Sequence, residues 1–376
     1  MRCAARGDHA GQTMKPLRIL HLTNDLSDRG NGIINAALDI ATTQRYAGHA
    51  VAFAAGGGGY EPFLKEHGIQ HYKLDQTRSV RNLPLALLRL RAIIAGFEPD
   101  ILHAHMRTGL VLARLLRPLY QRPVVAHLHN VAEPESRWMR LADRVIVVSV
   151  SVGRTMESHG IPRHKIRAVL NGMLNTRRIP RLSEVRPRLL MHPAILTVAG
   201  MYLHKGIAEL LMAFATIAEE FTEAHLYLVG DGPDRALFEA QADTLPCRAR
   251  IHFEGFQSQP QAYMRSADVF VLASRRDSFG LVLLEAREAG CAIVASDVDG
   301  IPEALNGGMA GMLVPPQNAQ ALAEALRQML RDPSLRDAWA RRASENLAGF
   351  SVERMASEVT EVYRELLPEA VGGFSA

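Results

Sequence analysis

Cysteine is scarce in this chain, and long apolar runs are missing from it. The 376 residues include three cysteines, Cys3, Cys247 and Cys291, which are too widely spaced for a disulfide framework or a zinc cluster. No stretch approaches the roughly 18 uninterrupted apolar residues of a membrane-spanning helix. Residues 1–13 lack the apolar core of a secretory signal, so we expect a disordered tail. A reducing cytoplasm is the expected compartment.

Acidic residues are also few in the first half of the chain. Residues 1–185 carry 26 Lys and Arg against 14 Asp and Glu, whereas residues 186–376 carry 17 against 25. The halves therefore have net charges of +12 and −8, in agreement with +4 for the whole chain. This split predicts an anionic partner for the first half, either a phosphate-bearing acceptor or an acidic membrane surface. Basic and aromatic residues do not interleave, so nucleic acid is not expected.

Short β-branched runs alternate with helical periods along most of the chain. In the first half they lie at 17–22, 51–55, 100–105, 124–129 and 145–149. In the second half they lie at 194–199, 225–230, 250–254, 268–273, 292–296 and 311–314. Alternation of strand and helix is typical of parallel sheets, so the sequence predicts an α/β protein with two Rossmann-like sheets.

Residues 171–193 interrupt this rhythm with three prolines and five arginines, which indicates a connection between domains. We place the domains at 14–185 and 186–350, and expect residues 351–376 to form a helix that packs back towards the first domain. Ligands of parallel sheets bind beyond the carboxyl ends of the strands, so a substrate is expected between the domains.

The densest chemical signal is the segment 274–303, SRRDSFGLVLLEAREAGCAIVASDVDGIPE. A loop carries Asp277, and Phe279 and Gly280 open a helix that contains Glu285. Free amides at a helix start, with the helix dipole behind them, suit a diphosphate. Carboxylates suit vicinal hydroxyls, so Glu285 is expected to bind a ribose diol rather than a protein group, and Asp277 to bind sugar hydroxyls.

A second segment reads VAGMYLHKG, a strand that runs into a turn at Gly200 and ends with Lys205 just before a helix. A cation beside a helix start attracts phosphate. Glycine turns also follow strands at Gly230 and at Gly255 with Phe256. Taken alone these are ordinary turns. Their order in the chain makes them candidates for a nucleotide pocket.

The first half has a glycine turn of its own, at Gly30 and Gly32, between a strand and a helix. Phosphates are often held at such a place, but the third glycine of a dinucleotide fingerprint is missing. No acidic residue ends the second strand, so NAD binding is not expected.

Four histidines, His103, His105, His127 and His129, alternate along two strand-like runs of the first half. Alternate residues of a strand point to one face, as metal ligands can. No cysteine or carboxylate lies at a matching spacing, so no metal site is predicted.

Arginines and leucines interleave in residues 78–94, where the arginines are Arg78, Arg81, Arg89 and Arg91. One interpretation is a basic helix that seeks a membrane surface. The other is a helix whose leucines face the sheet and whose arginines face water. Both remain open at this point.

The segment 274–303 resembles the signature of glycosyltransferase family 4, in which seven residues including Phe-Gly-Leu separate two acids and Gly-Ile-Pro-Glu follows. The resemblance extends from Arg18 to about Leu366. It implies the GT-B architecture, two Rossmann-like domains that face a central cleft. It also implies retaining transfer of a hexosyl group from a UDP- or GDP-linked sugar, bound by the second domain, to a glycan or lipid-linked acceptor bound by the first.

The resemblance also implies roles for particular residues. Lys205, His129 and Asp277 take catalytic positions. Gly30 and Gly32 are candidates for an acceptor or phosphate loop from their own place between a strand and a helix. The implied donor-binding residues are Gly200, Gly230, Gly255, Phe256, Ser278, Phe279, Gly280, Leu281 and Glu285. No metal and no cofactor are implied, because Lys205 and helix amides take the diphosphate.

The chain departs from the family pattern at two positions. Asp277 stands where the family usually has Glu, and Met201 stands where it has an arginine for the diphosphate. The candidates to replace that arginine are His204, Arg275 and Arg276.

Other functions fit the same architecture, because a fold alone does not set the chemistry. The alternatives are a glycan phosphorylase, a sugar-nucleotide epimerase and a sugar-nucleotide sensor without catalysis. Under the preferred interpretation the enzyme serves synthesis of lipopolysaccharide, capsule, exopolysaccharide or glycolipid. It would then lie in the cytoplasm, peripherally at the inner face of the plasma membrane.

Overall fold

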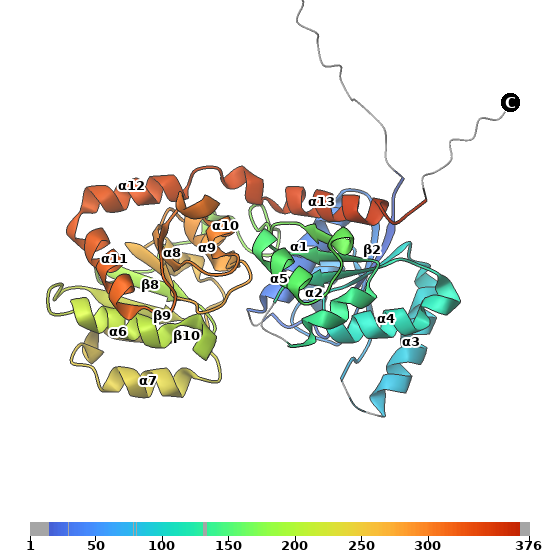
Figure 1. The fold of residues 1–376 in the computed structure, drawn as a ribbon, viewed down its shortest axis with the longest axis horizontal. Helices are drawn as coiled ribbons and strands as arrows, with labels where there is room; N and C mark the ends of the chain where they lie inside the picture. Colours follow the sequence, from blue (N-terminus) through green and yellow to red (C-terminus); the bar gives the residue numbers. More distant parts are fainter. Residues whose placement is uncertain (1–14, 29, 78, 80, 131–133, 369–376) are drawn as a thin grey trace, which may run out of the picture.

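The computed structural model describes residues 15–28, 30–77, 79, 81–130 and 134–368, which form two parallel sheets flanked by helices (Figure 1). The first sheet has seven strands in the order β3-β2-β1-β4-β5-β6-β7. Its strands are β1 (Arg18–Leu22), β2 (Ala50–Ala55), β3 (Gln70–Lys73), β4 (Ile101–Ala104), β5 (Val124–Leu128), β6 (Arg144–Val147) and β7 (Ile166–Ala168). Its helices are α1 (Gly32–Tyr46), α2 (Glu61–Glu66), α3 (Asn82–Phe97), α4 (Arg107–Tyr120) and α5 (Val150–Ser158).

The second sheet has six strands in the order β10-β9-β8-β11-β12-β13. Its strands are β8 (Ala194–Val198), β9 (His225–Val229), β10 (Ile251–Gly255), β11 (Val269–Leu272), β12 (Ala292–Ser296) and β13 (Met312–Val314). The helices after β8 are α6 (Ile207–Ile217), α7 (Arg235–Asp243), α8 (Gln261–Met264), α9 (Leu281–Glu288), α10 (Ile301–Ala304), α11 (Ala319–Arg331), α12 (Pro333–Ala343) and α13 (Val352–Arg364).

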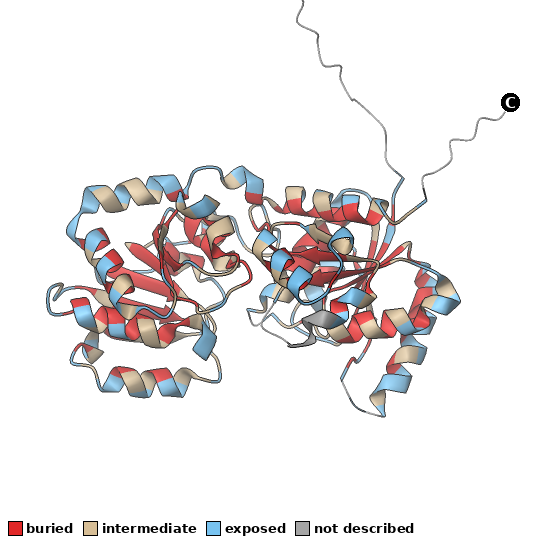
Figure 2. Ribbon diagram, in the orientation of Figure 1, coloured by how far each residue is buried: buried red, intermediate tan, exposed pale blue. Residues whose placement is uncertain are grey.

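Both sheets are buried, and Figure 2 shows their strands as the buried centre of each half. β-Branched and aliphatic side chains fill the strands because helices cover both faces of a parallel sheet. The strand order reverses between β1 and β4 and again between β8 and β11. Ligands bind at such reversals, beyond the carboxyl ends of the strands. These two edges therefore position the candidate site.

The last helix, α13, belongs to the first half in space. Its apolar residues recur at helical spacing, and Val352, Met355 and Val359 pack against Ile19 and Ile101 of the first sheet. In Figure 1, α12 and α13 run along the top of both halves. No helix within the described ranges is long and apolar enough to cross a membrane.

Candidate active site

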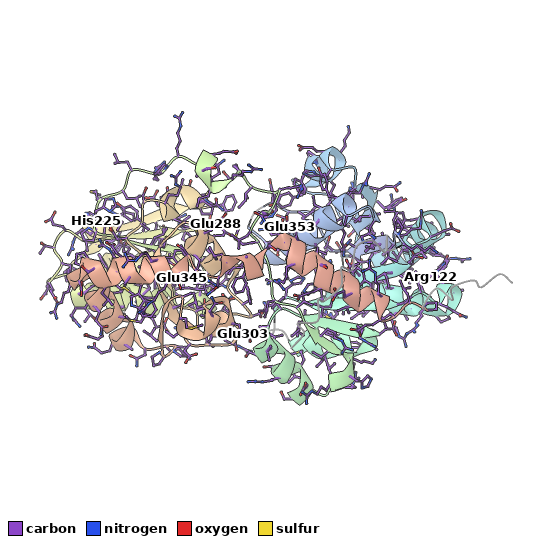
Figure 3. The ribbon with its side chains drawn as sticks, turned by 90° about the horizontal axis from the view of Figure 1, so that it is seen from above. Arg122, His225, Glu288, Glu303, Glu345 and Glu353 are labelled. Carbon is purple, nitrogen blue, oxygen red and sulfur yellow. The ribbon has the colours of Figure 1, made fainter. Side chains whose placement is uncertain are left out.

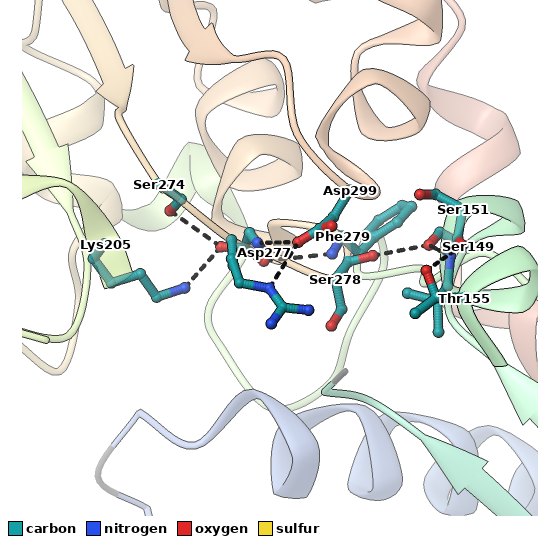
Figure 4. A network of polar contacts seen from close by, with 11 residues as sticks. Ser149, Ser151, Thr155, Lys205, Ser274, Asp277, Ser278, Phe279 and Asp299 are labelled. Carbon is teal, nitrogen blue, oxygen red and sulfur yellow. Dashed lines mark hydrogen bonds and ion pairs between the residues drawn. The ribbon is translucent and has the colours of Figure 1, made fainter. Parts of the chain in front are cut away.

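Lys205 and Asp277 form an ion pair between two loops of the second half (Figure 4). The Lys205 Nζ atom lies 2.7 Å from Oδ2 of Asp277, and the side chains are 23% and 12% exposed. Gly206 follows in the left-handed region, where a Cβ atom would lie 1.8 Å from the Ala273 carbonyl oxygen. Glycine is therefore required beside Lys205, and this close approach holds the lysine against the end of β11.

The loop of Asp277 leads into the first turn of α9. The Asp277 amide donates to Oδ2 of Asp299 at 3.0 Å, and Gly300 donates to the Asp277 carbonyl oxygen at 3.2 Å. Gly280 precedes α9 with φ 76°, which allows the chain to enter the helix directly from the loop. The first amides of a helix have no intrahelical acceptor. The positive charge of Lys205 and the start of α9 thus flank the same loop.

The predicted donor-binding residues share one edge of the second sheet. Gly200 follows β8, Gly230 follows β9 and Gly255 ends β10. The loop after β11 carries residues 277–280, and Leu281 begins α9. The glycine turn of the first half lies against this edge. A Cβ atom at Gly30 would lie 3.4 Å from the Phe256 ring, and one at Gly32 would lie 3.7 Å from Leu281.

Glu285 lies half-buried on α9. Burial raises the pKa of its carboxyl to about 7, although the guanidinium of Arg178 and a hydrogen bond from Gln261 act in the opposite direction. Gln261 Nε2 donates to Oε2 of Glu285 at 2.8 Å. The expectation that Glu285 has no protein partner was therefore wrong. Gln261 lies 24 residues away on the short helix α8, and sequence spacing does not indicate the contact.

Three residues were candidates to replace the arginine missing at Met201, whose side chain is buried in the core of the second half. Arg275 is paired with Glu209 at 2.7 Å. Burial and Lys205 lower the pKa of His204, which keeps that ring neutral. The Arg276 side chain is half exposed, and its Nε lies 4.0 Å from Asp299. Arg276 is thus the less engaged of the two arginines.

Two contacts that the sequence did not suggest join the halves at this loop. The Ser149 hydroxyl donates to the Ser278 carbonyl oxygen at 3.0 Å. The Glu303 carboxylate accepts the first two amides of α5, from Val150 and Ser151, each at 2.8 Å. Figure 3 shows Glu303 at the junction of the halves. Glu303 ends the Gly-Ile-Pro-Glu motif, so its carboxylate caps a helix of the other half.

Arg178 is a further buried charge that sequence analysis did not single out. Its Nη2 atom lies 3.4 Å from Oδ2 of Asp39 on α1, and both side chains are almost fully buried. Its charge also acts on Glu285, which belongs to the second half. The run of arginines before β8 was interpreted only as a connection, and nothing local distinguishes Arg178 from its neighbours.

Five histidines converge at the carboxyl ends of β1, β4 and β5: His21, His103, His105, His127 and His129. Burial lowers the pKa of every ring, to about 4 for His21 and about 3 for His129. Neutral rings so close together act as hydrogen-bond partners or as metal ligands.

The five histidines form two overlapping groups of three. Within each group, one ring nitrogen from every histidine lies within 4.8 Å of the others. One group is His21, His103 and His105, and the other is His105, His127 and His129. The absence of a suitable spacing along one strand therefore did not exclude a ligand cluster, because the rings come from three strands. Hydrogen bonds already join several of these nitrogens, at 3.0 and 3.1 Å.

Comparison with known proteins agrees with these features. The family described as "Glycosyltransferase Family 4" matches residues 30–173, and "Glycosyl transferases group 1" matches residues 181–346. A D-inositol 3-phosphate glycosyltransferase from Corynebacterium urealyticum is 30% identical over 314 residues, which cover 73% of this chain and 74% of that protein. A phosphatidyl-myo-inositol mannosyltransferase from Mycolicibacterium smegmatis is 28% identical over 354 residues, covering 89% and 90%.

Solved structures share the fold. Anabaena HepE, crystallised with UDP, matches with a TM-score of 0.78 at 21% identity, over 93% of this chain and 100% of that one. WaaG, a glycosyltransferase involved in lipopolysaccharide biosynthesis, matches with a TM-score of 0.71 at 16% identity, over 94% and 100%. The predicted GT-B architecture is confirmed. The chain is a glycosyltransferase that belongs to family 4, the group 1 glycosyl transferases.

Proposed function

We propose that this glycosyltransferase moves a hexosyl group from a UDP- or GDP-linked sugar to an acceptor hydroxyl and retains the anomeric configuration. The observation that carries the proposal is the Lys205–Asp277 pair at the start of α9, with Glu285 one turn further along the same helix. In this arrangement the diphosphate binds Lys205 and the amides of α9, the ribose binds Glu285, and the sugar lies between Asp277 and His129.

Catalysis is then mainly electrostatic. Negative charge develops on the departing diphosphate, and a preorganised cation and helix amides stabilise it without reorganisation. The ion pair with Asp277 holds Lys205 in place before the donor arrives. Arg276 is the best placed substitute for the missing family arginine. We favour a front-face route, in which the leaving phosphate takes the acceptor proton. The buried carboxylate of α1, Asp39, is already bonded to Arg178 and Thr176 and is not offered as a nucleophile.

The acceptor side belongs to the first half. Two relatives are named for inositol-containing acceptors, one a phosphate and one a phospholipid. The +12 charge of residues 1–185 fits an anionic acceptor of this kind. We propose a phosphate-bearing or lipid-linked acceptor and a role in cell-surface glycolipid or polysaccharide synthesis. The enzyme would work in the cytoplasm at the inner face of the plasma membrane.

The exposed surface of α3 supports contact with anionic lipid. Leu85 and Leu88 of α3 are 65% and 61% exposed. Arg89 and Arg91 lie on the same helix and Arg81 is its N-cap residue, and all three arginines are exposed. The interpretation in which the leucines of this helix face the sheet therefore holds for Leu90 and fails for these two. Arg78 lies outside the described residues.

We expect the protein to bind anionic vesicles more strongly than neutral ones, because each basic residue near the surface adds about 1 kcal/mol. Replacing Arg81, Arg89 and Arg91 together by Gln should remove most of this binding and leave nucleotide affinity unchanged. Vesicle flotation at low and physiological salt measures it. The substitutions Arg327→Gln and Arg331→Gln on α11 serve as the control. Equal flotation with neutral lipid at low salt would contradict membrane contact and favour a water-soluble acceptor.

Activity is expected to survive exhaustive treatment with EDTA. Lys205 and the amides of α9 supply the positive charge that a metal would otherwise bring to the diphosphate. Turnover is compared before and after chelation, with metal content measured in both samples. Loss of turnover that magnesium, manganese or zinc restores would show that an ion takes part.

A donor panel tests the proposed function. UDP-, GDP- and ADP-sugars are screened by thermal shift, because a bound ligand stabilises the folded state by mass action. Donors that bind are then offered with an acceptor, and nucleoside diphosphate is measured. A transferase releases nucleoside diphosphate in the same amount as it forms glycosylated acceptor. A sensor binds without release, an epimerase changes the sugar without release, and a phosphorylase requires phosphate and yields a sugar phosphate.

A further inference from the structure

An unbroken run of hydrogen bonds connects the last helix to the histidines of the candidate site. The Thr360 hydroxyl on α13 donates to the Ala356 carbonyl oxygen at 2.7 Å. Nε2 of Gln44 on α1 donates to the Thr360 hydroxyl oxygen at 3.1 Å. Oε1 of Gln44 lies 3.1 Å from Nε2 of His21. All of these side chains are buried, so water does not compete for the contacts.

The run continues through two contacts between rings. Nδ1 of His21 lies 3.0 Å from Nε2 of His105, and Nδ1 of His105 lies 3.1 Å from Nε2 of His129. Each contact holds one proton, and each neutral ring carries one N–H. The direction of the first hydrogen bond therefore sets the direction of all the others.

Thr360 sets that direction. Its only proton goes to Ala356, so its oxygen accepts, and the atom of Gln44 that faces it is the amide nitrogen. Oε1 of Gln44 then accepts from Nε2–H of His21. Nδ1 of His21 accepts from Nε2–H of His105, and Nδ1 of His105 accepts from Nε2–H of His129.

We propose that Thr360 and Gln44 are positioning residues that fix the tautomer of His129, with its proton on Nε2 and its lone pair on Nδ1 offered to a sugar hydroxyl. The Nδ1 atom has no hydrogen-bond partner among the described residues and is not one of their buried unpaired atoms. The contact between His129 and a sugar hydroxyl rests on the proposed function, whereas the assignment of the His129 tautomer does not.

A metal ion is the competing use of the same rings. It would need lone pairs on nitrogens that now face one another across hydrogen bonds of 3.0 and 3.1 Å. His103 and His127 have buried nitrogens without a partner in the described structure, but neither belongs to the run. The run leaves no proton unassigned, and for this reason we favour the tautomer over the ion.

Neutron crystallography of the deuterated full chain tests the proposal. We expect deuterium on Nε2 of His129 and none on Nδ1. Gln44→Met should reverse the run, because an orphaned N–H on His21 is more costly than an orphaned lone pair. Thr360→Ser keeps the hydroxyl and should keep the tautomer. Thr216→Val is the matched control, since Thr216 makes the same kind of bond to Met212 at 2.8 Å on α6.

Activity gives a second measurement. Gln44→Met should lower kcat/KM for the donor by about 10-fold, the effect of one misdirected hydrogen bond, and leave the affinity for free nucleoside diphosphate unchanged. Thr360→Ser and Thr216→Val should stay within about twofold of the wild type. If Gln44→Met does not fold, Thr360→Val tests the same point. Without the Thr360 hydroxyl either end of the Gln44 amide can face His21, so we expect a mixture of the two neutral tautomers of His129, with partial deuterium occupancy at Nε2 and at Nδ1.

Deuterium on Nδ1 of the wild-type His129, an unaltered tautomer in Gln44→Met, or zinc bound among the rings would each overturn the proposal. A wild-type protein with the expected tautomer but no turnover on any donor would instead overturn the proposed function.

Discussion

Lys205→Ala should lower turnover at saturating donor by about 10² or more, the loss expected for one preorganised stabiliser of developing charge. Among the described residues, Lys205 is the only one whose positively charged side chain contacts Asp277. Its removal leaves that carboxylate without its cation next to the departing diphosphate. Steady-state release of nucleoside diphosphate measures the effect.

Two variants control this result. Lys205→Arg keeps the charge but changes the shape of the donor group, so it should recover part of the turnover. Lys65→Ala removes an exposed positive charge on α2 and should have no effect. If Lys205→Ala turns over at the wild-type rate, the diphosphate does not bind at Lys205.

Glu285→Ala should weaken nucleotide binding on the order of 10-fold or more, because a hydrogen bond to a charged group contributes about 1.5–3 kcal/mol. Affinity in the wild type should rise as pH rises through about 7, since the pKa of Glu285 is raised to that value and the carboxylate is the stronger acceptor. Glu285→Gln should remove this pH dependence. Titration calorimetry measures the affinity loss and its pH dependence. The titrations run from about pH 5.5 to about pH 8.5, roughly 1.5 units on either side of the Glu285 pKa of about 7.

The same pKa predicts the stability of the free protein. Burial raises the pKa of Glu285, so the folded state holds a proton that the unfolded state releases. The favourable contribution is complete below the unfolded value of 4.5 and is lost as pH rises through about 7. Glu285→Gln should therefore raise Tm more at pH 8 than at pH 5. Glu324→Gln, on the exposed face of α11, should not raise Tm more at pH 8 than at pH 5.

The binding prediction has its own contradicting result. An unchanged nucleotide affinity in Glu285→Ala would show that the ribose binds elsewhere.

Much of the fold was predictable because its signals are local. Runs such as 194–199 and 268–273 are short, apolar and followed by helical periods, and each corresponds to a strand of the second sheet. The motif 274–303 follows one strand directly, so the loop of Asp277 was expected at the carboxyl edge of the sheet.

Contacts that depend on strand order were not predictable in the same way. His21 meets His105 because β1 lies beside β4, although 84 residues separate the two rings. Gln261 reaches Glu285 from another helix, and Glu303 reaches α5 from the other half of the chain. In each case one partner carries a motif and the other is an ordinary residue.

The central claim is tested most directly by following one reaction by NMR with α-linked sugar nucleotides from the donor panel. Inositol phosphate and phosphatidylinositol vesicles are the acceptors, and Lys205→Ala is the control. We expect nucleoside diphosphate and an α-linked glycoside to appear in equal amounts with the wild type, and neither with the variant at a comparable rate. A β-linked product, or an equal rate in Lys205→Ala, would contradict retaining transfer at this site.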